Sequence, residues 1–318
     1  MKSFLTIGEP LIVFSSEDLN AELMDAKHFK KYLAGAELNV AVGVSRLGIE
    51  SRYITAIGND PLGQSIKREV EQNGIHTNYI ETNNDYWTGF YLKQRVDKGD
   101  PDIFYYRKNS AASHYNTDSL EKIDFENVGL IHCSGIMAAI SENGYRSVEK
   151  LMDMANDREI VTTYDPNIRP QLWLDKQEMK QKLNYLASKA VIVMPGIHEG
   201  EQLVGTDDPE DIADFYLNQS SITQAVVIKA GPSGAYLKVR GEQLQLIDGY
   251  RVENVVDTVG AGDGFAVGMI SGLLEDIGIK NAVKRACAIG ALAVQDAGDS
   301  DGYPTRMELD KFMGVNNG

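Results

Sequence analysis

Short runs of hydrophobic, β-branched residues alternate with longer amphipathic stretches from about residue 128 onward. Such short runs suit strands that are buried on both faces, and the amphipathic stretches suit helices that cover a sheet. The alternation predicts a three-layer α/β/α fold with a mostly parallel central sheet. The expected strands are Val128–Ile131, Ile160–Tyr164, Val191–Met194 and Ala225–Ile228.

Each of these expected strands ends in polar or glycine-containing sequence. Ligands of open α/β sheets bind at the carboxyl ends of the strands, so we expect a ligand site at this edge. The segments that would line it are 133–135, 165–167, 195–196 and 229–231.

One part of the chain departs from this alternation. Trp87–Val96 and Ile103–Lys108 both have the pattern of strands, and the turn-rich residues 97–102 between them indicate a hairpin. With the early run Leu11–Phe14, the hairpin is expected to form a small β lid. We therefore expect a single domain over 1–318, with a lid built from about 10–16 and 86–108 that excludes water from a site below it.

Composition and charge indicate which partners and which cellular location to expect. The 318 residues are 43% hydrophobic, enough for a large core, and carry a formal net charge of −15. This charge disfavours nucleic acid and anionic membrane surfaces as partners. A signal segment and a transmembrane stretch are not apparent, so the cytoplasm is the expected location. Cys133 and Cys287 lie in apolar surroundings, which predicts buried thiols.

The segment 257–265 carries the most specific chemistry. Gly260–Gly262 can present consecutive backbone N–H groups to an anion, and the apolar stretch over 265–274 predicts a helix whose N-terminal end favours negative charge. A carboxylate at an anion site is electrostatically unfavourable unless it has a function. For Asp263 that function would be to accept a proton from a hydroxyl that attacks a phosphoryl group. The alternative is a flexible turn, with Asp263 as an ordinary first-turn helix acid.

Aromatic and basic residues on the expected hairpin indicate a binding surface. Tyr105 and Arg107 are two residues apart, so on a strand they point to one face, and Tyr91 joins them from the partner strand. Arg169 follows an expected strand and would overhang the same cleft. Two guanidinium groups suit the carboxylate of a sugar acid. The alternatives are an exposed strand with a surface arginine and, for Arg169, contact with nucleotide phosphates.

Gly35 and Asn39 lie at the start of an apolar helical run over 40–47. Gly35 allows a ligand to approach the backbone closely, and Asn39 offers both a donor and an acceptor to sugar hydroxyls. A helix-opening loop explains Asn39 equally well.

The sequence indicates the nucleotide-binding residues less specifically, because the chain has no Walker-type phosphate loop. The absence of that loop disfavours a P-loop kinase. Lys229, Gly231 and Gly234 follow an expected strand and would border a nucleotide, or form an ordinary β-turn. Glu199 is a candidate for orienting a magnesium-bound water, with a solvated first-turn helix acid as the alternative.

These motifs together resemble the ribokinase-like (PfkB) carbohydrate kinases over essentially the whole chain. The resemblance rests on residues 35–39, 105–107 with 110–113, 165–170 with 172–173, and 257–265. One departure concerns magnesium, since many members carry Asn-x-x-Glu where this chain has glycine at position 196 before Glu199. The geometry of a magnesium-bound water is therefore in question, although the magnesium requirement is not.

The resemblance also implies roles for individual residues, with Asp263 as the catalytic base. The implied anion hole consists of Gly260, Ala261 and Gly262. The residues implied to contact a sugar acid are Gly35, Asn39, Tyr91, Tyr105, Arg107, Arg169, Asp263 and a late aspartate, for which we choose Asp299 over Asp296 and Asp301. The residues implied to border ATP are Asn167, Arg169, Lys229, Gly231, Gly234, Gly260 and Gly262.

Within the family the motifs most resemble the kinases of 2-keto-3-deoxygluconate. This implies ATP- and Mg²⁺-dependent phosphorylation of the terminal hydroxyl, giving the 6-phosphate. Two alternatives remain: a fructokinase or other neutral-sugar kinase, which the paired arginines disfavour, and a non-catalytic sugar-acid sensor, which would not need Asp263. Acceptance of the C4 epimer, 2-keto-3-deoxygalactonate, stays open. An exposed lid edge often pairs with another copy, so a homo-oligomer is expected.

Overall fold

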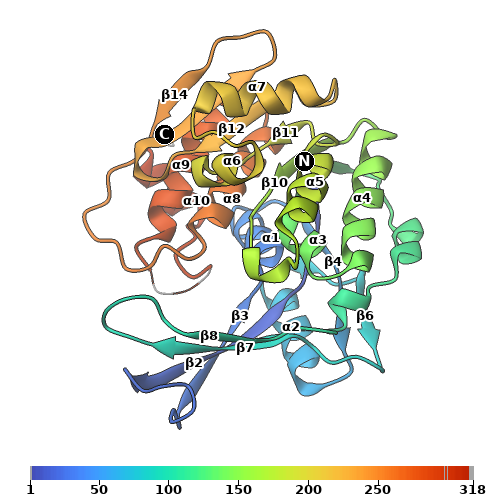
Figure 1. The fold of residues 1–318 in the computed structure, drawn as a ribbon, viewed down its shortest axis with the longest axis vertical. Helices are drawn as coiled ribbons and strands as arrows, with labels where there is room; N and C mark the ends of the chain where they lie inside the picture. Colours follow the sequence, from blue (N-terminus) through green and yellow to red (C-terminus); the bar gives the residue numbers. More distant parts are fainter. Residues whose placement is uncertain (1, 297, 299, 315–318) are drawn as a thin grey trace.

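A ten-stranded β-sheet forms the centre of the molecule (Figure 1). The computed structural model describes residues 2–296, 298 and 300–314. The strand order is β14-β13-β12-β11-β10-β9-β1-β4-β5, with β6 also paired to β4, and all pairs are parallel except β12–β13 and β13–β14. The predicted α/β fold with a mostly parallel sheet is confirmed. The strands are β1 (Ser3–Ile7), β4 (Ser51–Gly58), β5 (Ile75–His76), β6 (Ile80–Asn83), β9 (Val128–Ser134), β10 (Val161–Asp165), β11 (Ile192–Val193), β12 (Ala225–Lys229), β13 (Gly234–Val239) and β14 (Gln245–Asp248).

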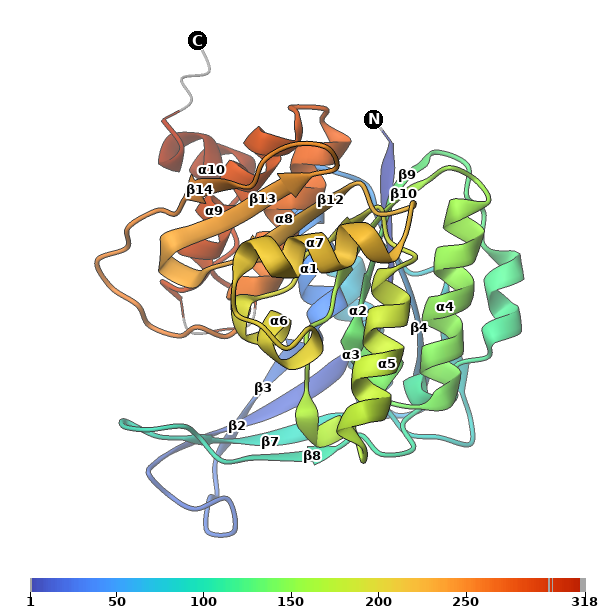
Figure 2. The ribbon, with the colours of Figure 1, turned by 45° about the horizontal axis from the view of Figure 1, so that its top comes forward.

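Helices cover both faces of this sheet (Figure 2). Successive strand residues point to opposite faces, so Phe4 packs into one hydrophobic cluster and Leu5 into another. The first cluster is covered by α1 (Ala36–Arg46), α2 (Pro61–Gln72), α8 (Ala261–Leu274), α9 (Ile279–Ala293) and α10 (Arg306–Phe312). The second is covered by α3 (Gly135–Ala139), α4 (Glu142–Asn156), α5 (Lys176–Ala187) and α7 (Pro209–Gln219), and α6 (Ile197–Leu203) lies between α5 and α7 in sequence. Short 3₁₀ turns span Ala112–His114, Thr117–Lys122, Pro170–Leu172 and Gly231–Ser233.

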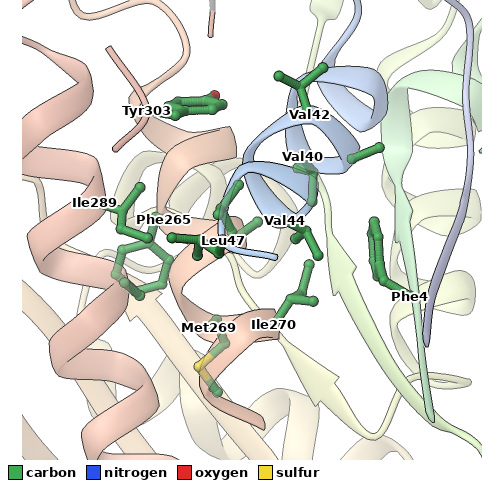
Figure 3. Close-up of a cluster of buried hydrophobic side chains, with 14 of the residues drawn as sticks. Phe4, Val40, Val42, Val44, Leu47, Phe265, Met269, Ile270, Ile289 and Tyr303 are labelled. Carbon is green, nitrogen blue, oxygen red and sulfur yellow. The ribbon is translucent and has the colours of Figure 1, made fainter. Parts of the chain in front are cut away.

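Helix α8 is buried along most of its length and packs between α1 and α9. Figure 3 shows side chains of α1, such as Val44, with Phe265 and Ile270 of α8 and Ile289 of α9. The close approach of α9 requires Gly268, because a Cβ atom there would lie 2.4 Å from the Cα of Ala286. This packing fixes the position of the N-terminal end of α8, where the glycine run lies.

A second, smaller sheet projects from this body, at the bottom of Figure 1. Its order is β3-β2-β7-β8, with β2 at Leu11–Leu19, β3 at Phe29–Ala34, β7 at Phe90–Arg95 and β8 at Ile103–Tyr106. The sequence predicted three of these strands. It missed β3, because Lys30 and Lys31 interrupt the apolar pattern of that strand.

Two helices begin earlier than the apolar pattern predicted. Helix α8 begins at Ala261, four residues before Phe265, and α1 begins at Ala36, four residues before Val40. In both, the preceding glycine has a positive φ, 79° at Gly260 and 132° at Gly35. Apolar periodicity locates the buried part of a helix, whereas the first turns here face a cavity.

Two further sequence predictions bear on the described part of the chain. Cys133 and Cys287 are free and buried, as predicted. Within the described residues, every helix is too short or too polar to cross a lipid bilayer.

Candidate active site

A cavity of about 340 Å³ lies between the small sheet, the carboxyl ends of the central strands and the N-terminal end of α8. It brings together most of the residues singled out from the sequence, although they come from distant parts of the chain. These lining residues are Gly35, Asn39, Tyr91, Tyr105, Arg107, Asn167, Arg169, Lys229, Gly260, Gly262 and Asp263.

Asp263 lies in the first turn of α8, and its carboxylate is held on both oxygens. Asn39 Nδ2 donates to Oδ2 at 2.9 Å, and Asn167 Nδ2 donates to Oδ1 at 3.5 Å. Burial raises the pKa of Asp263 to about 7, although the hydrogen bond from Asn39 acts in the opposite direction. A carboxyl group with this pKa is ionised in a large fraction of molecules near neutral pH and is well matched to accept a proton.

Asn167 reaches Asp263 because of its unusual backbone. Its φ is +39°, in the left-handed region that asparagine tolerates better than most residues. Asp165, the last residue of β10, stabilises this turn by accepting a hydrogen bond from the N–H of Asn167 at 3.1 Å. The loop that follows β10 thereby directs Asn167 toward the N-terminal end of α8.

The glycine run forms a turn that ends at the start of α8. Tyr303 donates a hydrogen bond to the carbonyl oxygen of Gly260 at 2.8 Å, which anchors the turn. The N–H of Ala261 points back to the carbonyl oxygen of Thr258 at 3.4 Å, and Ala261 does not line the cavity. The N–H of Gly262 has no hydrogen-bond acceptor in the described part of the chain. Gly262 at the positive end of α8 therefore suits an anion better than Ala261.

Lys229 supplies a positive charge beside this turn. Its ammonium group lies 2.5 Å from Asp165 Oδ2 and 3.8 Å from Glu199 Oε2. Burial alone would lower the pKa of Lys229, but the two carboxylates outweigh it and raise the pKa. Its Nζ lies 4.0 Å from the position of a Cβ built on Gly262, so the charged group sits next to the turn.

Glu199 is bonded to backbone amides and does not line the cavity. Its Oε1 accepts from the N–H of Ile168 at 2.8 Å, and its Oε2 accepts from the N–H of Gly196 at 2.7 Å, which caps α6. Each oxygen keeps a second lone pair for a water. No cluster of three or more metal-ligating side chains occurs among the residues that the structure describes. These residues therefore fit a Mg²⁺ ion that is bound mainly through nucleotide phosphates and waters.

The small sheet supplies the aromatic and basic wall of the cavity. Tyr91 on β7 lies opposite Tyr105 on β8, and the two ring centroids are 5.1 Å apart. Arg107 follows one residue after β8 ends, whereas the sequence pattern placed it within a strand that extended to residue 108. Arg107 nevertheless lines the same cavity, and it forms an ion pair with the buried Glu9.

Some residues singled out from the sequence lie elsewhere. Gly231 and Gly234, with φ values of 56° and 105°, shape the turn between β12 and β13 and do not line the cavity. At Gly234 a Cβ would lie 2.1 Å from the carbonyl oxygen of Ile247, so the turn itself requires glycine. Asp299 lies outside the described residues.

Three charged residues of the cavity were given no role from the sequence: Glu9, Lys93 and Asp165. Lys93 is two residues after Tyr91, so the alternation that placed Tyr91 also places Lys93 on the cavity face. Glu9 follows β1 and Asp165 ends β10, so both stand at carboxyl ends of central strands, where ligand sites are expected. Those signals were available in the sequence.

Comparison with known proteins gives consistent matches. The family model described as pfkB family carbohydrate kinase matches residues 1–306. A Bacillus subtilis relative named 2-dehydro-3-deoxygluconokinase is 43% identical over 97% of this chain and 94% of its own. A PfkB protein from Polaromonas has a crystal structure with a TM-score of 0.87 and 36% identity, covering 98% of this chain and 99% of its own. An E. coli protein described as a ribokinase II, crystallised with ATP and Mg²⁺, has a TM-score of 0.88 and 25% identity, covering 99% of this chain and 100% of its own.

Proposed function

The chain belongs to the pfkB family of carbohydrate kinases, and from that premise we propose that it transfers a phosphoryl group from ATP to a sugar acid. The observation that carries the proposal is the presence, in one cavity, of Asp263 with Arg107 and Arg169. Asp263 provides a base whose pKa of about 7 suits proton transfer. The arginines provide guanidinium groups for a carboxylate.

The proposed reaction follows from the chain's own groups. A sugar hydroxyl bound at Asp263 gives its proton to the carboxylate as its oxygen attacks the γ-phosphoryl group, and ADP leaves with the electron pair of the broken bond. Asn39 and Asn167 fix the orientation of the carboxylate. The N–H of Gly262 and the ammonium group of Lys229 stabilise charge on the phosphoryl group. Bound Mg²⁺ would neutralise part of the phosphate charge.

The proposed substrate is 2-keto-3-deoxygluconate, also called 2-dehydro-3-deoxygluconate, and the proposed product is its 6-phosphate. The name of the 43% identical B. subtilis relative supports this choice. In this proposal Gly35, Tyr91, Tyr105 and the arginines contact the sugar acid, and Asp299 is retained as a further contact. The residues proposed to border ATP are Asn167, Arg169, Lys229, Gly231, Gly234, Gly260 and Gly262, with Ala261 retained in the anion hole and Glu199 acting on magnesium through water.

The test is ATP-dependent ADP release with 2-keto-3-deoxygluconate, its C4 epimer, gluconate, fructose and ribose, each with and without Mg²⁺. The proposal expects turnover with the keto-deoxy acids that depends on Mg²⁺. A neutral-sugar kinase is the second candidate, because Glu9 already pairs with Arg107. Preference for fructose or ribose would support that candidate and overturn the substrate assignment, and the absence of turnover with every sugar would overturn the proposed kinase activity.

We also propose that the chain forms a homo-oligomer through the small sheet. Strand β8 lies at an edge of this sheet and exposes Phe104 and Tyr106. Edge strands with exposed apolar side chains favour pairing with another chain. Light scattering coupled to size exclusion should give a mass of at least two chains, and a Phe104→Glu, Tyr106→Glu variant should shift it toward one. A wild-type mass of one chain would contradict this.

A further inference from the structure

Glu9 is a buried carboxylate at the junction between the central sheet and the small sheet. It lies between β1 and β2, its side chain is 0% exposed, and it lines the cavity. Its Oε2 lies 2.5 Å from Arg107 Nη2 and accepts a hydrogen bond from Arg107 Nε at 2.8 Å. Its Oε1 accepts a hydrogen bond from Ser110. Glu9 thus joins the segment between β1 and β2 to the loop that follows β8.

The packing around this carboxylate leaves little room for other arrangements. Gly89 lies just before β7, and a Cβ there would be 2.8 Å from Glu9 Oε1 and 3.5 Å from the Cβ of Arg107. The same Cβ would lie 2.6 Å from Leu11 Cδ2, so a side chain at position 89 would have to displace both the Glu9 carboxylate and the end of Leu11. The position of Glu9 is therefore determined by its surroundings, and Glu9 in turn determines the position of the guanidinium group.

Glu9 occupies only one edge of that guanidinium group. Nε donates a hydrogen bond to Glu9 and Nη2 forms the ion pair on the same side edge, but neither Nη2 nor Nη1 donates a hydrogen bond to any residue that the structure describes. Arg107 Cζ lies over the ring of Tyr105, 5.7 Å from the ring centroid. The terminal edge therefore remains for a ligand, and a planar carboxylate fits the paired donors of a guanidinium edge.

We propose that Glu9 is a positioning residue that holds Arg107 with its terminal edge toward the carboxylate of the sugar acid. This inference rests on the proposed function. A free arginine side chain samples many rotamers and loses that freedom when it binds a ligand. Glu9 holds Arg107 in the required rotamer before the ligand binds. The arginine side chain therefore loses less conformational entropy on binding.

The test compares Glu9→Ala, Glu9→Gln, Arg107→Ala and the double variant Glu9→Ala/Arg107→Ala, using steady-state kinetics with 2-keto-3-deoxygluconate and ATP. We expect Glu9→Ala to raise KM for the sugar acid by about tenfold, with kcat and the KM for ATP within twofold of wild type. Glu9→Gln keeps an acceptor oxygen for Arg107 and should recover most of the loss. If Glu9 acts through Arg107, the double variant should have the KM of Arg107→Ala alone.

Two further variants separate positioning from a structural role. Ser110→Ala removes the other hydrogen bond of Glu9 and leaves the ion pair, so KM should stay near the wild-type value. Gly89→Ala keeps both charged residues but crowds the Glu9 carboxylate and the end of Leu11, so it should raise KM for the sugar acid several-fold. Gly89→Ala also serves as the test if Glu9→Ala does not fold.

The results that overturn the inference are distinct from those that overturn the proposed function. Wild-type turnover of the sugar acid together with unchanged KM in Glu9→Ala and Gly89→Ala would overturn the inference alone. So would additive effects in the double variant, or an equal rise in the KM for ATP. If the wild-type protein does not turn over any sugar acid, the proposed function fails and the inference fails with it.

Discussion

Asp263 combines a raised pKa with fixed geometry, and both follow from its surroundings. Burial disfavours the charged form, while the amide group of Asn39 favours it. These two effects together leave the pKa of Asp263 at about 7. A modest change in its burial or in its hydrogen bond with Asn39 would therefore shift that pKa within the neutral range. This gives the proposed base a measurable signature.

The activity of the wild-type protein should depend on pH through Asp263. The protonated carboxyl cannot accept a proton, so kcat/KM for the sugar acid should fall as the pH is lowered through about 7. Asn39→Ala removes the hydrogen bond that favours the ionised form, so the inflection should move to higher pH. Asn281→Ala, an exposed asparagine on α9, is the matched control and should leave the inflection in place. An inflection that stays or moves to lower pH in Asn39→Ala would contradict this account.

The same raised pKa predicts an effect on stability. An acid whose pKa rises on folding destabilises the fold fully above the folded pKa, here about 7, and has no such effect below the unfolded value of about 3.8. Asp263→Asn removes the buried charge, so its Tm should exceed that of the wild type by a few degrees at pH 8 and by much less at pH 5. A Tm difference that does not grow with pH would argue against a raised pKa.

The sequence alone singles out residues that are marked by their immediate neighbours in the chain. Asp263 was found because its glycine run is contiguous, and Arg169 because it follows a strand. The pairing of Glu9 with Arg107 was not found, because the two residues are 98 positions apart and only the folded chain brings them together. Glu199 fits its local pattern of a first-turn helix acid, because its carboxylate caps α6, and its action on magnesium through water stays a prediction.

The packing of α8 against α9 fixes the end of α8 that bears Asp263, and it depends on small residues. At Gly268 an added Cβ would overlap the backbone of Ala286, whereas at Gly290 its nearest neighbour would be the carbonyl oxygen of Ala261 at 3.4 Å. Both glycines lie inside helices, so alanine gains similar helix propensity at either position. The two positions therefore separate the packing requirement from helix propensity.

Gly268→Ala should destabilise the protein by about 1–3 kcal/mol, because the helices must move apart to accept the methyl group. Gly290→Ala should change stability by no more than about 1 kcal/mol, and in the favourable direction. Urea denaturation of the two variants beside wild type checks both values. Equal stability of the two variants would show that the close approach at Gly268 is not required.

The small sheet illustrates how far an alternating pattern can predict an element. The pattern predicted β2, β7 and β8 and the face that carries Tyr91 and Tyr105. It could not predict β3, because the two lysines of that strand give it the polar pattern of a loop. It also could not predict the ion pair of Lys93 with Asp257 at 3.5 Å. That pair joins β7 to the segment before the glycine run and depends on tertiary structure alone.

The chain as a whole is acidic, with a net charge of −15, yet its cavity concentrates basic groups. Three of them are paired with carboxylates: Arg107 with Glu9, Lys229 with Asp165, and Lys93 with Asp257. Each pair holds a cation in place while leaving part of it accessible. The lining has four basic side chains against three carboxylates, so the cavity is less acidic than the chain as a whole, which suits the proposed anionic substrate.

The most direct test of the account compares the wild-type protein with Asp263→Asn. Turnover is measured as ADP release with 2-keto-3-deoxygluconate and ATP, and the affinity for the sugar acid is measured separately by calorimetry. We expect Asp263→Asn to bind the sugar acid with an affinity close to wild type and to lower kcat by at least about 10²-fold, because the amide cannot accept the proton. Near-normal turnover by Asp263→Asn would contradict the account, because Asp263 would then not be the base.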